Sequence, residues 1–346
     1  MPSQILHTMF GEDVFTALHG RLAEKTAPDF SPEKIFSGYR GAFVLGCQGP
    51  DIFYHSQRHK PVALEYGSLL HRRGFGIFSA GLLKMTLRGS EIDAHCAYSL
   101  GFITHAFLDR LCHPYIIYRS EKKYHSFFER IVDSLMLKKL RNLEPALWDQ
   151  ERILAQVCET PPPALKELTA RCLCETFPEK AGKDRSLARR IDNAFIDSAR
   201  FYNMSSPSRI AGAFRAGSNE KPLVFTRRAL NYVYPQNLPA EIDFLNLDRN
   251  PWRYPHIPAD GQMPQEDTRS FLDIYAGAIN SAVDTIAPII AQYIENGVFL
   301  SDTAERIGNQ CLSILDENGK PCAPNLTEPF PLEKVFNQQA KLRGVF

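Results

Sequence analysis

The sequence carries almost no excess of charge of either sign. Among its 346 residues, 40 Lys and Arg stand against 39 Asp and Glu, which leaves a formal net charge of +1. Proteins that bind nucleic acid without sequence preference draw most of their affinity from a basic surface, because lysine and arginine neutralise the phosphates. The balanced composition therefore argues against a nucleic-acid partner.

The sequence also lacks a long hydrophobic run and a recognisable leader. No stretch approaches the roughly 20 uninterrupted apolar residues that mark a transmembrane helix. The first residues, Met-Pro-Ser-Gln-Ile-Leu-His, show no basic start followed by an apolar core. We therefore expect a cytoplasmic protein without a transmembrane segment, whose contact with any membrane is peripheral.

Cysteines at disulfide or metal-site spacing are missing as well. The eight cysteines include no Cys-x-x-Cys pair, and Cys172 and Cys174 are too close for an ordinary disulfide or a zinc knuckle. We expect reduced, mostly buried cysteines, as in cytoplasmic proteins.

Strand-like alternation is absent, whereas helical periodicity recurs along the chain. The periodicity predicts helices over residues 90–112, 122–141, 164–176 and 185–202. In the first of these, apolar residues recur at three- and four-residue steps; they are Ile92, Cys96, Leu100, Ile103 and Phe107. The pattern predicts an all-α fold, a multi-helix bundle.

The C-terminal half contains one long interruption of this pattern. Residues 235–266 hold six prolines and predict a long irregular loop, anchored to the helices by Trp252. A long helix should follow, capped by Asp267 and Thr268 and ended by Gly297. We divide the chain into one helical domain, residues 1–300, and a C-terminal extension, residues 301–346.

Histidines are concentrated in the first third of the chain, where nine of the ten lie within residues 1–125. His105, Asp109 and His113 are each four residues apart, so on a helix they share one face at steps of about 6 Å. Imidazole and carboxylate side chains in such register suit a zinc ion with nitrogen and oxygen ligands. Pro114 favours ending the helix there, which would turn His113 toward a second metal.

The next predicted helix repeats this spacing of a histidine and a carboxylate, because His125 and Glu129 are also four residues apart. Upstream, Asp51 offers a carboxylate on a turn, and His71 and His7 offer further imidazoles. One such pair would be weak evidence, since a lone helical histidine is usually a packed or surface residue. Two pairs on consecutive helices, with His113 between them, favour a metal cluster.

Other candidates near this cluster have a weaker case. Cys112 is adjacent to His113, but we expect it to be a packed side chain rather than a ligand. His55 and His59 lie in a polar stretch that predicts surface residues, with His59 as a candidate substrate contact.

These motifs resemble the zinc-dependent phospholipase C family, which includes the glycosylphosphatidylinositol-specific phospholipase D and shares its fold with the S1/P1 nucleases. The resemblance covers roughly residues 1–135. It rests on His7, Pro50-Asp51-Ile52-Phe53-Tyr54, Gly67-x3-His71, His105-x3-Asp109, His113-Pro114-Tyr115 and His125-x3-Glu129.

The resemblance implies two or three Zn²⁺ ions and a ligand set for each. Asp51, His71, His105 and Asp109 would hold one ion. A second would be held by His113, His125 and Glu129, and a third by Asp109 and His7. In the family, an N-terminal Trp also binds the third metal, whereas the first Trp of this sequence is Trp148.

The resemblance further implies a zinc-dependent phosphodiester hydrolase, phospholipase C-like, that activates water for attack on a phosphodiester such as a phospholipid. Asp51 would orient or deprotonate the attacking water. Choline-selective members carry an aromatic residue directly after the corresponding Asp, where this sequence has Ile52.

Two alternatives stay open at this point. One is a nuclease or nucleotidase on the same scaffold, in which Tyr54, Tyr66 and Phe75 could stack a base. The other is a non-catalytic helical binding protein that zinc stabilises. Its sites would be closed and cysteine-rich, which the motifs here are not.

Overall fold

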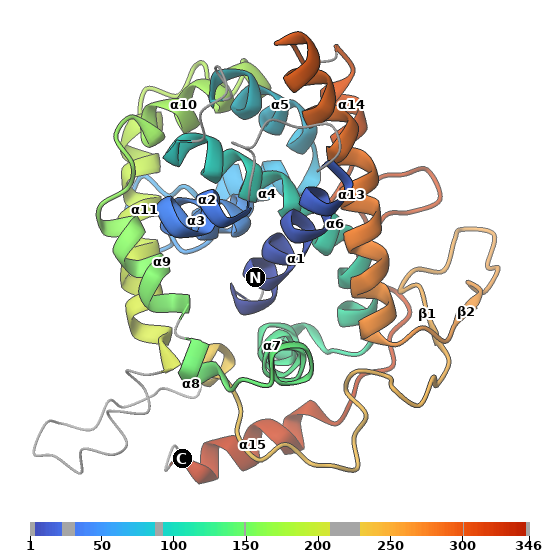
Figure 1. Cartoon of the computed structure of the whole chain (residues 1–346). Coiled ribbons are helices and arrows are strands. Elements are labelled where there is room, and N and C mark those ends of the chain that lie inside the picture. The colour runs from blue at the N-terminus through green and yellow to red at the C-terminus, as the bar shows by residue number, and fades with distance from the viewer. Residues whose placement is uncertain are drawn as a thin grey trace, which may run out of the picture.

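The computed structural model describes residues 4–22, 32–86, 93–148, 150–207, 229–299 and 301–343. These residues form α-helices joined by loops and short 3₁₀ turns, with a single pair of two-residue strands (Figure 1). The all-α prediction is confirmed.

The longest helices are α1 (Gln4–Leu22), α6 (Ala94–Tyr118), α7 (His125–Arg141), α11 (Leu187–Ser205) and α13 (Phe271–Asn296). The shorter ones are α2 (Pro32–Gly38), α3 (Arg40–Cys47), α4 (Leu64–Arg72), α5 (Phe75–Thr86), α8 (Pro145–Trp148), α9 (Gln150–Glu159), α10 (Leu165–Thr176), α14 (Thr303–Ile307) and α15 (Leu332–Leu342). The 3₁₀ turns are η1 (Gly49–Phe53), η2 (Lys122–Tyr124) and η3 (Ala229–Tyr232), and the strands are β1 (Trp252–Arg253) and β2 (Glu266–Asp267).

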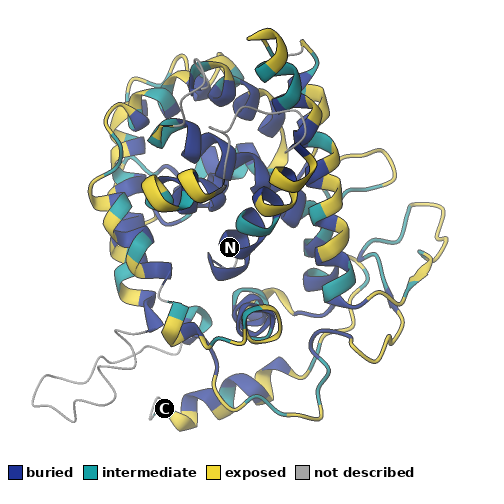
Figure 2. Cartoon of the chain, in the orientation of Figure 1, coloured by how far each residue is buried: buried dark blue, intermediate teal, exposed yellow. Residues whose placement is uncertain are grey.

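Helix α6 is the buried axis of this arrangement. It is in contact with α1, α3, α5, α7 and α13, and most of its residues are buried (Figure 2). Its first turn is capped by Asp93, whose side chain accepts a hydrogen bond from the backbone N–H of Cys96 at 2.8 Å. Ile92, which the periodicity placed in this helix, lies outside the described residues.

The helix does not end at Pro114, as the sequence predicts, but continues for four more residues to Tyr118. Proline has no N–H to donate, so this turn loses one backbone hydrogen bond. Packing compensates, because Tyr115 and Tyr118 are buried and the Tyr115 hydroxyl donates to the Phe244 carbonyl at 3.0 Å. His113 therefore projects from a continuous helix.

Helices α3 and α6 approach so closely that only glycine fits between them. A Cβ on Gly46 would lie 2.1 Å from the Tyr98 carbonyl oxygen, and one on Gly101 would lie 2.3 Å from that of Phe43. Both distances are far below van der Waals contact. This close packing places the α3–η1 segment, and with it Asp51, against the middle of α6.

The sequence predicts the end of helix α13 correctly but not its start. Its N-cap is Ser270, in a capping box with Asp273, rather than the predicted Asp267 or Thr268. Ser270 forms both reciprocal hydrogen bonds, whereas Asp267 is engaged by Arg269. At the other end Gly297, with φ of 69°, terminates the helix as predicted.

Among the described residues, α13 is the one helix long and apolar enough to cross a membrane by length and composition. A search for uninterrupted apolar runs passes over it because Asp273 and Asp284 interrupt the sequence. Half of its most apolar window is buried inside the protein, and it packs on α1 and α6. Core helices share this composition, so the helix is weak evidence for a membrane span.

The proline-rich residues 235–266 contain β1 and, at their end, the first residue of β2, and they otherwise follow an irregular path (Figure 1). Trp252 is buried beside α6, with its ring 5.4 Å from that of Tyr115. The chain after residue 300 packs on the same body, since α14 contacts α5 and Phe336 of α15 contacts Phe127 of α7.

The close approach of α3 and α6 predicts a strong effect of one added methyl group. Gly101→Ala should lower the free energy of unfolding by about 2 kcal/mol or more, because the Phe43 carbonyl cannot move without shifting α3. Chemical denaturation followed by circular dichroism measures this. Gly277→Ala in α13 is the matched control, since its Cβ would meet nothing within 4 Å, and it should be neutral or stabilising. Equal effects of the two substitutions would contradict the packing argument.

Candidate metal centre

Histidine and carboxylate side chains from five elements meet beside the middle of α6. Their ligand atoms form three groups, within each of which the atoms lie no more than 4.8 Å apart. The groups are His7, His105 and Asp109; Asp51, His71 and His105; and His113, His125 and Glu129. All eight residues named from the sequence thus lie in these groups, and their roles as ligands remain a prediction.

The second group joins η1, α4 and α6. His71 Nε2 lies 3.0 Å from Asp51 Oδ1 and 3.7 Å from Asp109 Oδ2, while His105 Nε2 lies 3.2 Å from Asp109 Oδ2. Four side chains therefore point two imidazole nitrogens and two carboxylates at one small volume. This is the number of ligands that a tetrahedral zinc ion takes.

Asp109 connects this group with the first. Its Oδ1 atom lies 3.2 Å from His7 Nε2, whereas its Oδ2 atom faces His105 and His71. The rings of His7 and His105 are stacked, with centroids 4.1 Å apart. The two oxygens of one carboxylate thus serve different groups, which is the arrangement of a bridging ligand.

The third group lies two turns along α6 from His105. His125 Nε2 lies 3.0 Å and His113 Nε2 3.7 Å from Glu129 Oε1. His125 and Glu129 are one turn apart on α7, as their spacing predicts. Since α6 runs on through Pro114, His113 reaches this group by the position of α7 and not by a break in its own helix.

The opposite ring nitrogens are bound to oxygen atoms, which orients the imidazoles. The Nδ1–H groups of His71, His105 and His113 donate to the carbonyls of Gly67, Cys47 and Leu312 at 2.8, 3.2 and 2.8 Å. This leaves Nε2 of each ring facing the carboxylates, where a neutral imidazole offers its lone pair to a metal. Metal-binding histidines are held in this way.

Gly49 explains how Asp51 comes so near α6. It has a φ of 54°, in the left-handed region, and a Cβ there would lie 2.4 Å from the Cγ atom of His105. Glycine therefore permits both the turn into η1 and the contact with the imidazole.

The residues present fit zinc. Three buried carboxylates converge, and burying such charges without a counter-charge costs several kcal/mol. Several of these ligand atoms form no hydrogen bond of good geometry among the described residues, although they lie close to one another. They are both carboxylate oxygens of Asp51, Oδ2 of Asp109 and Nε2 of His105. Atoms that converge without bonding to one another are arranged for a shared cation.

Charge couples these side chains strongly. Burial raises the pKa of Asp109, but the imidazoles of His113 and His105 outweigh it and hold this pKa well below the usual range. Burial lowers the pKa of His113, and the carboxylates of Asp109 and Glu129 overcome it and raise this pKa to about 9. The metal-free centre therefore holds a proton on His113 at neutral pH.

A cavity of about 760 Å³ opens onto the second and third groups. Its lining includes Asp51, His71, His113 and His125. The solvent side of the centre is therefore accessible, while His7, His105 and Asp109 are buried behind it.

One wall of this cavity comes from the chain after residue 300, which no local signal in the sequence links to the metal motifs. The Leu312 N–H donates to the His71 carbonyl at 2.8 Å, and the Leu312 carbonyl accepts from His113 Nδ1. Arg110 donates to the carbonyls of Ile307 and Gly308 at 2.6 and 2.8 Å. These bonds fasten residues 307–312 across α4 and α6.

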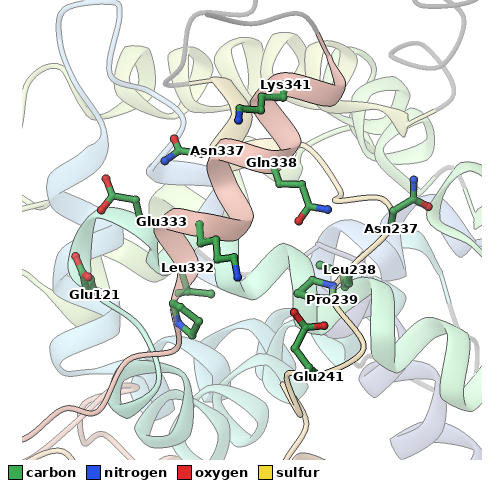
Figure 3. Close-up of a pocket in the computed structure, with 12 residues that line it drawn as sticks. Glu121, Asn237, Leu238, Pro239, Glu241, Leu332, Glu333, Asn337, Gln338 and Lys341 are labelled. Carbon is green, nitrogen blue, oxygen red and sulfur yellow. The ribbon is translucent and has the colours of Figure 1, made fainter.

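A larger cavity, of about 1090 Å³, lies elsewhere. Figure 3 shows it between α15 and the loop at residues 237–241, and it is lined by amides and by charged groups of both signs, such as Glu333 and Lys341. It contains no histidine and none of the eight clustered residues, so size alone does not identify the reactive site.

The remaining sequence candidates lie apart from the three groups. His55, predicted at the surface, is instead buried with its ring stacked on Phe201 at 4.0 Å. The prediction was wrong because the neighbouring residues in the sequence are polar, whereas Phe201 is far away in the chain. His59 is about half exposed and lies 3.3 Å from Asp197. Cys112 is a buried side chain, and none of the eight cysteines forms a disulfide.

Comparison with known proteins agrees with the motifs. Residues 6–169 match the family model described as zinc dependent phospholipase C, and this region contains all eight clustered residues. No curated protein and no solved structure matches the chain. The resemblance stated from the motifs is confirmed.

The raised pKa of His113 predicts proton release on zinc binding. At pH 8 the metal-free chain should still hold this proton, which an ordinary histidine with a pKa of about 6.5 would have lost. A zinc-bound imidazole must be neutral, so binding should release about one proton from His113. Titration calorimetry in two buffers of different ionisation enthalpy measures the release.

The same proton sets how stability changes with pH in the metal-free chain. Between about pH 6.5 and 9 the folded chain binds more protons at His113 than the unfolded chain, so the free energy of unfolding should fall over this window. His113→Gln should abolish both effects. Heats at pH 8 that do not depend on the buffer would contradict the assignment.

Proposed function

Because residues 6–169 match the zinc-dependent phospholipase C family, we propose that the chain hydrolyses phosphodiesters at a centre of two or three zinc ions. Asp51, His71, His105 and Asp109 hold one ion. A second is held by His113, His125 and Glu129. Asp109 and His7 hold a third where it is present. The substrate that the family suggests is a phospholipid, reached from a membrane surface by peripheral contact.

One observation carries this proposal: a cluster of histidine and carboxylate ligands, without a thiol among them, lies at the floor of an open cavity. Structural zinc sites are usually closed four-ligand cages that contain cysteine, whereas catalytic sites leave room for water and substrate. The same observation weighs against a binding protein that zinc merely stabilises.

Zinc in these groups would polarise the phosphoryl oxygens and lower the pKa of water toward neutrality. Asp51 then has the position of the base. It lines the cavity, and its carboxylate oxygens accept no hydrogen bond among the described residues, so they can orient the attacking water and take its proton. Asp109 is buried behind the histidines and holds the cluster together.

The nuclease alternative loses the aromatic residues it needs. Tyr66 is buried, with its hydroxyl bound to Asp184 at 2.6 Å, and Phe75 is buried against Phe102. Tyr54 is the one of the three that lines the cavity. Stacking of successive bases would require more than a single exposed ring.

Two carboxamide variants separate the predicted roles. Asp109→Asn should remove at least one zinc ion per chain and abolish phosphodiesterase activity with it, because one carboxylate serves two groups. Asp51→Asn should lower kcat by about 100-fold or more while retaining most of the metal. Elemental mass spectrometry after exhaustive dialysis gives the zinc content, and hydrolysis of a short-chain phospholipid gives kcat.

Asp260→Asn, at an exposed carboxylate outside the three groups, is the control and should match the wild type in both measurements. Small and equal losses in the two site variants would refute the proposed roles. A wild-type protein with well under one zinc ion per chain, not restored by added zinc, would refute the centre itself.

A further inference from the structure

Beyond the clustered residues, the metal cavity has a lining of distinct character. Among the described residues that line it, Arg72 is the one charged side chain outside the three groups. The others are hydroxyl, thiol or apolar side chains: Tyr54, Ser68, Cys311, Ser313, Ile314, Pro321, Cys322 and Ala323. A ligand that extends from the metal groups into this space meets one positive charge and no negative one.

Arg72 is available to such a ligand. It follows His71 directly at the C-terminal end of α4, its side chain is exposed, and it forms no ion pair in the described part of the chain. Arg110, by contrast, donates to two backbone carbonyls of the cavity wall. The planar guanidinium suits a phosphate or carboxylate, which it binds through paired N–H groups.

Hydroxyl groups accompany this charge. Tyr54, Ser68 and Ser313 line the cavity, and their hydroxyls form no hydrogen bond within the described part of the chain. They come from three separate segments: the residue after η1, helix α4 and the C-terminal wall. Free hydroxyls can donate to the oxygens of an anionic or polyhydroxylated head group.

The same lining is unsuited to a quaternary ammonium group. Recognition of such cations uses several aromatic faces or a free carboxylate, but Tyr54 is the sole aromatic residue in the lining. Ile52 and Phe53 are buried and do not line the cavity. Arg72 would in addition repel a positive charge.

The geometry points to a substrate whose head group carries a negative charge, a phosphate or a carboxylate, beyond the scissile phosphodiester. Arg72 pairs with that charge, and the hydroxyls of Ser68 and Ser313 donate to its oxygens. Arg72 is thus the residue that determines head-group specificity. This inference rests on the proposed phosphodiesterase function, because the metal groups fix the end of the substrate from which the head group extends.

Binding of product-like compounds tests the inference without any hydrolysis. The probes are 3-phosphoglycerate, glycerol 3-phosphate and phosphocholine, which share a phosphate and carry a negative, a neutral and a positive group beyond it. Titration calorimetry on the zinc-loaded protein should give tighter binding of 3-phosphoglycerate than of phosphocholine by about tenfold or more, with glycerol 3-phosphate between them. One charge contact at a partly exposed site changes the affinity by roughly fivefold. Here the attraction of Arg72 to one probe and its repulsion of the other both contribute to the ratio of affinities.

Variants at position 72 identify the cause of the preference. Arg72→Gln should reduce the tenfold ratio to about twofold or less, and Arg72→Glu should reverse the order of the probes. Arg73→Gln is the matched control, since Arg73 is the next residue, equally exposed, and does not line the cavity; it should bind as the wild type does. Equal binding of the three probes by the wild type, no measurable binding of 3-phosphoglycerate, or equal effects of the two glutamine variants would overturn the inference.

Hydrolysis then separates this inference from the function on which it rests. Short-chain phosphodiester lipids with anionic and with choline head groups should differ in kcat/KM in the same direction as the probes, and Arg72→Gln should remove the difference. A charge preference in binding that depends on Arg72, with no hydrolysis of any lipid, would refute the catalytic proposal and retain the anion subsite. Hydrolysis without a preference would refute the subsite and retain the catalytic proposal.

Discussion

The structure depends on how one carboxylate is shared. Asp109 turns Oδ1 toward His7 and Oδ2 toward His105 and His71, so three helices must hold their distances to a fraction of an ångström around a single side chain. A buried carboxylate is costly unless its partners are in place. The glycine contact between α3 and α6, the capped start of α6 and the packing of its final turn all act to hold this residue where it is.

Helix α1 is brought to the centre by a second buried network. Asp133 of α7 accepts hydrogen bonds from the N–H groups of Leu6 and Ile5 at 2.8 and 3.4 Å, and it is itself within reach of Arg130 and Tyr234. The N–H groups of a helix start have no partners within the helix, and a carboxylate both satisfies them and complements the helix dipole. Because Asp133 follows Glu129 by one turn, α7 positions His7 with one residue and contributes to the third group with another.

The open side of the centre is built from the far end of the chain. Leu312 bonds to the backbone of His71 and to the ring of His113, and the residues around it line the cavity together with Arg72. The part of the chain that matches the family model thus carries the eight clustered residues together with Tyr54, Ser68 and Arg72 of the cavity lining, while the wall at residues 311–323 lies outside that match.

The sequence by itself determined the helical class, the two His-x3-acid pairs and the nitrogen and oxygen character of the donors, because helical periodicity and four-residue spacing are local properties of α6 and α7. With the family resemblance it also named Asp51, His71 and His7. Tertiary structure alone decided that α6 runs through Pro114, that His55 is buried, that Ser270 caps α13 and that Leu312 spans two helices. Each of these is set by contacts between residues far apart in the chain, and such contacts outweigh the preferences of single residues. The buried Tyr115 and Tyr118 compensate for the hydrogen bond that Pro114 cannot make. The guanidinium of Arg72 lines a cavity only because the distant residues 311–323 form the rest of its lining.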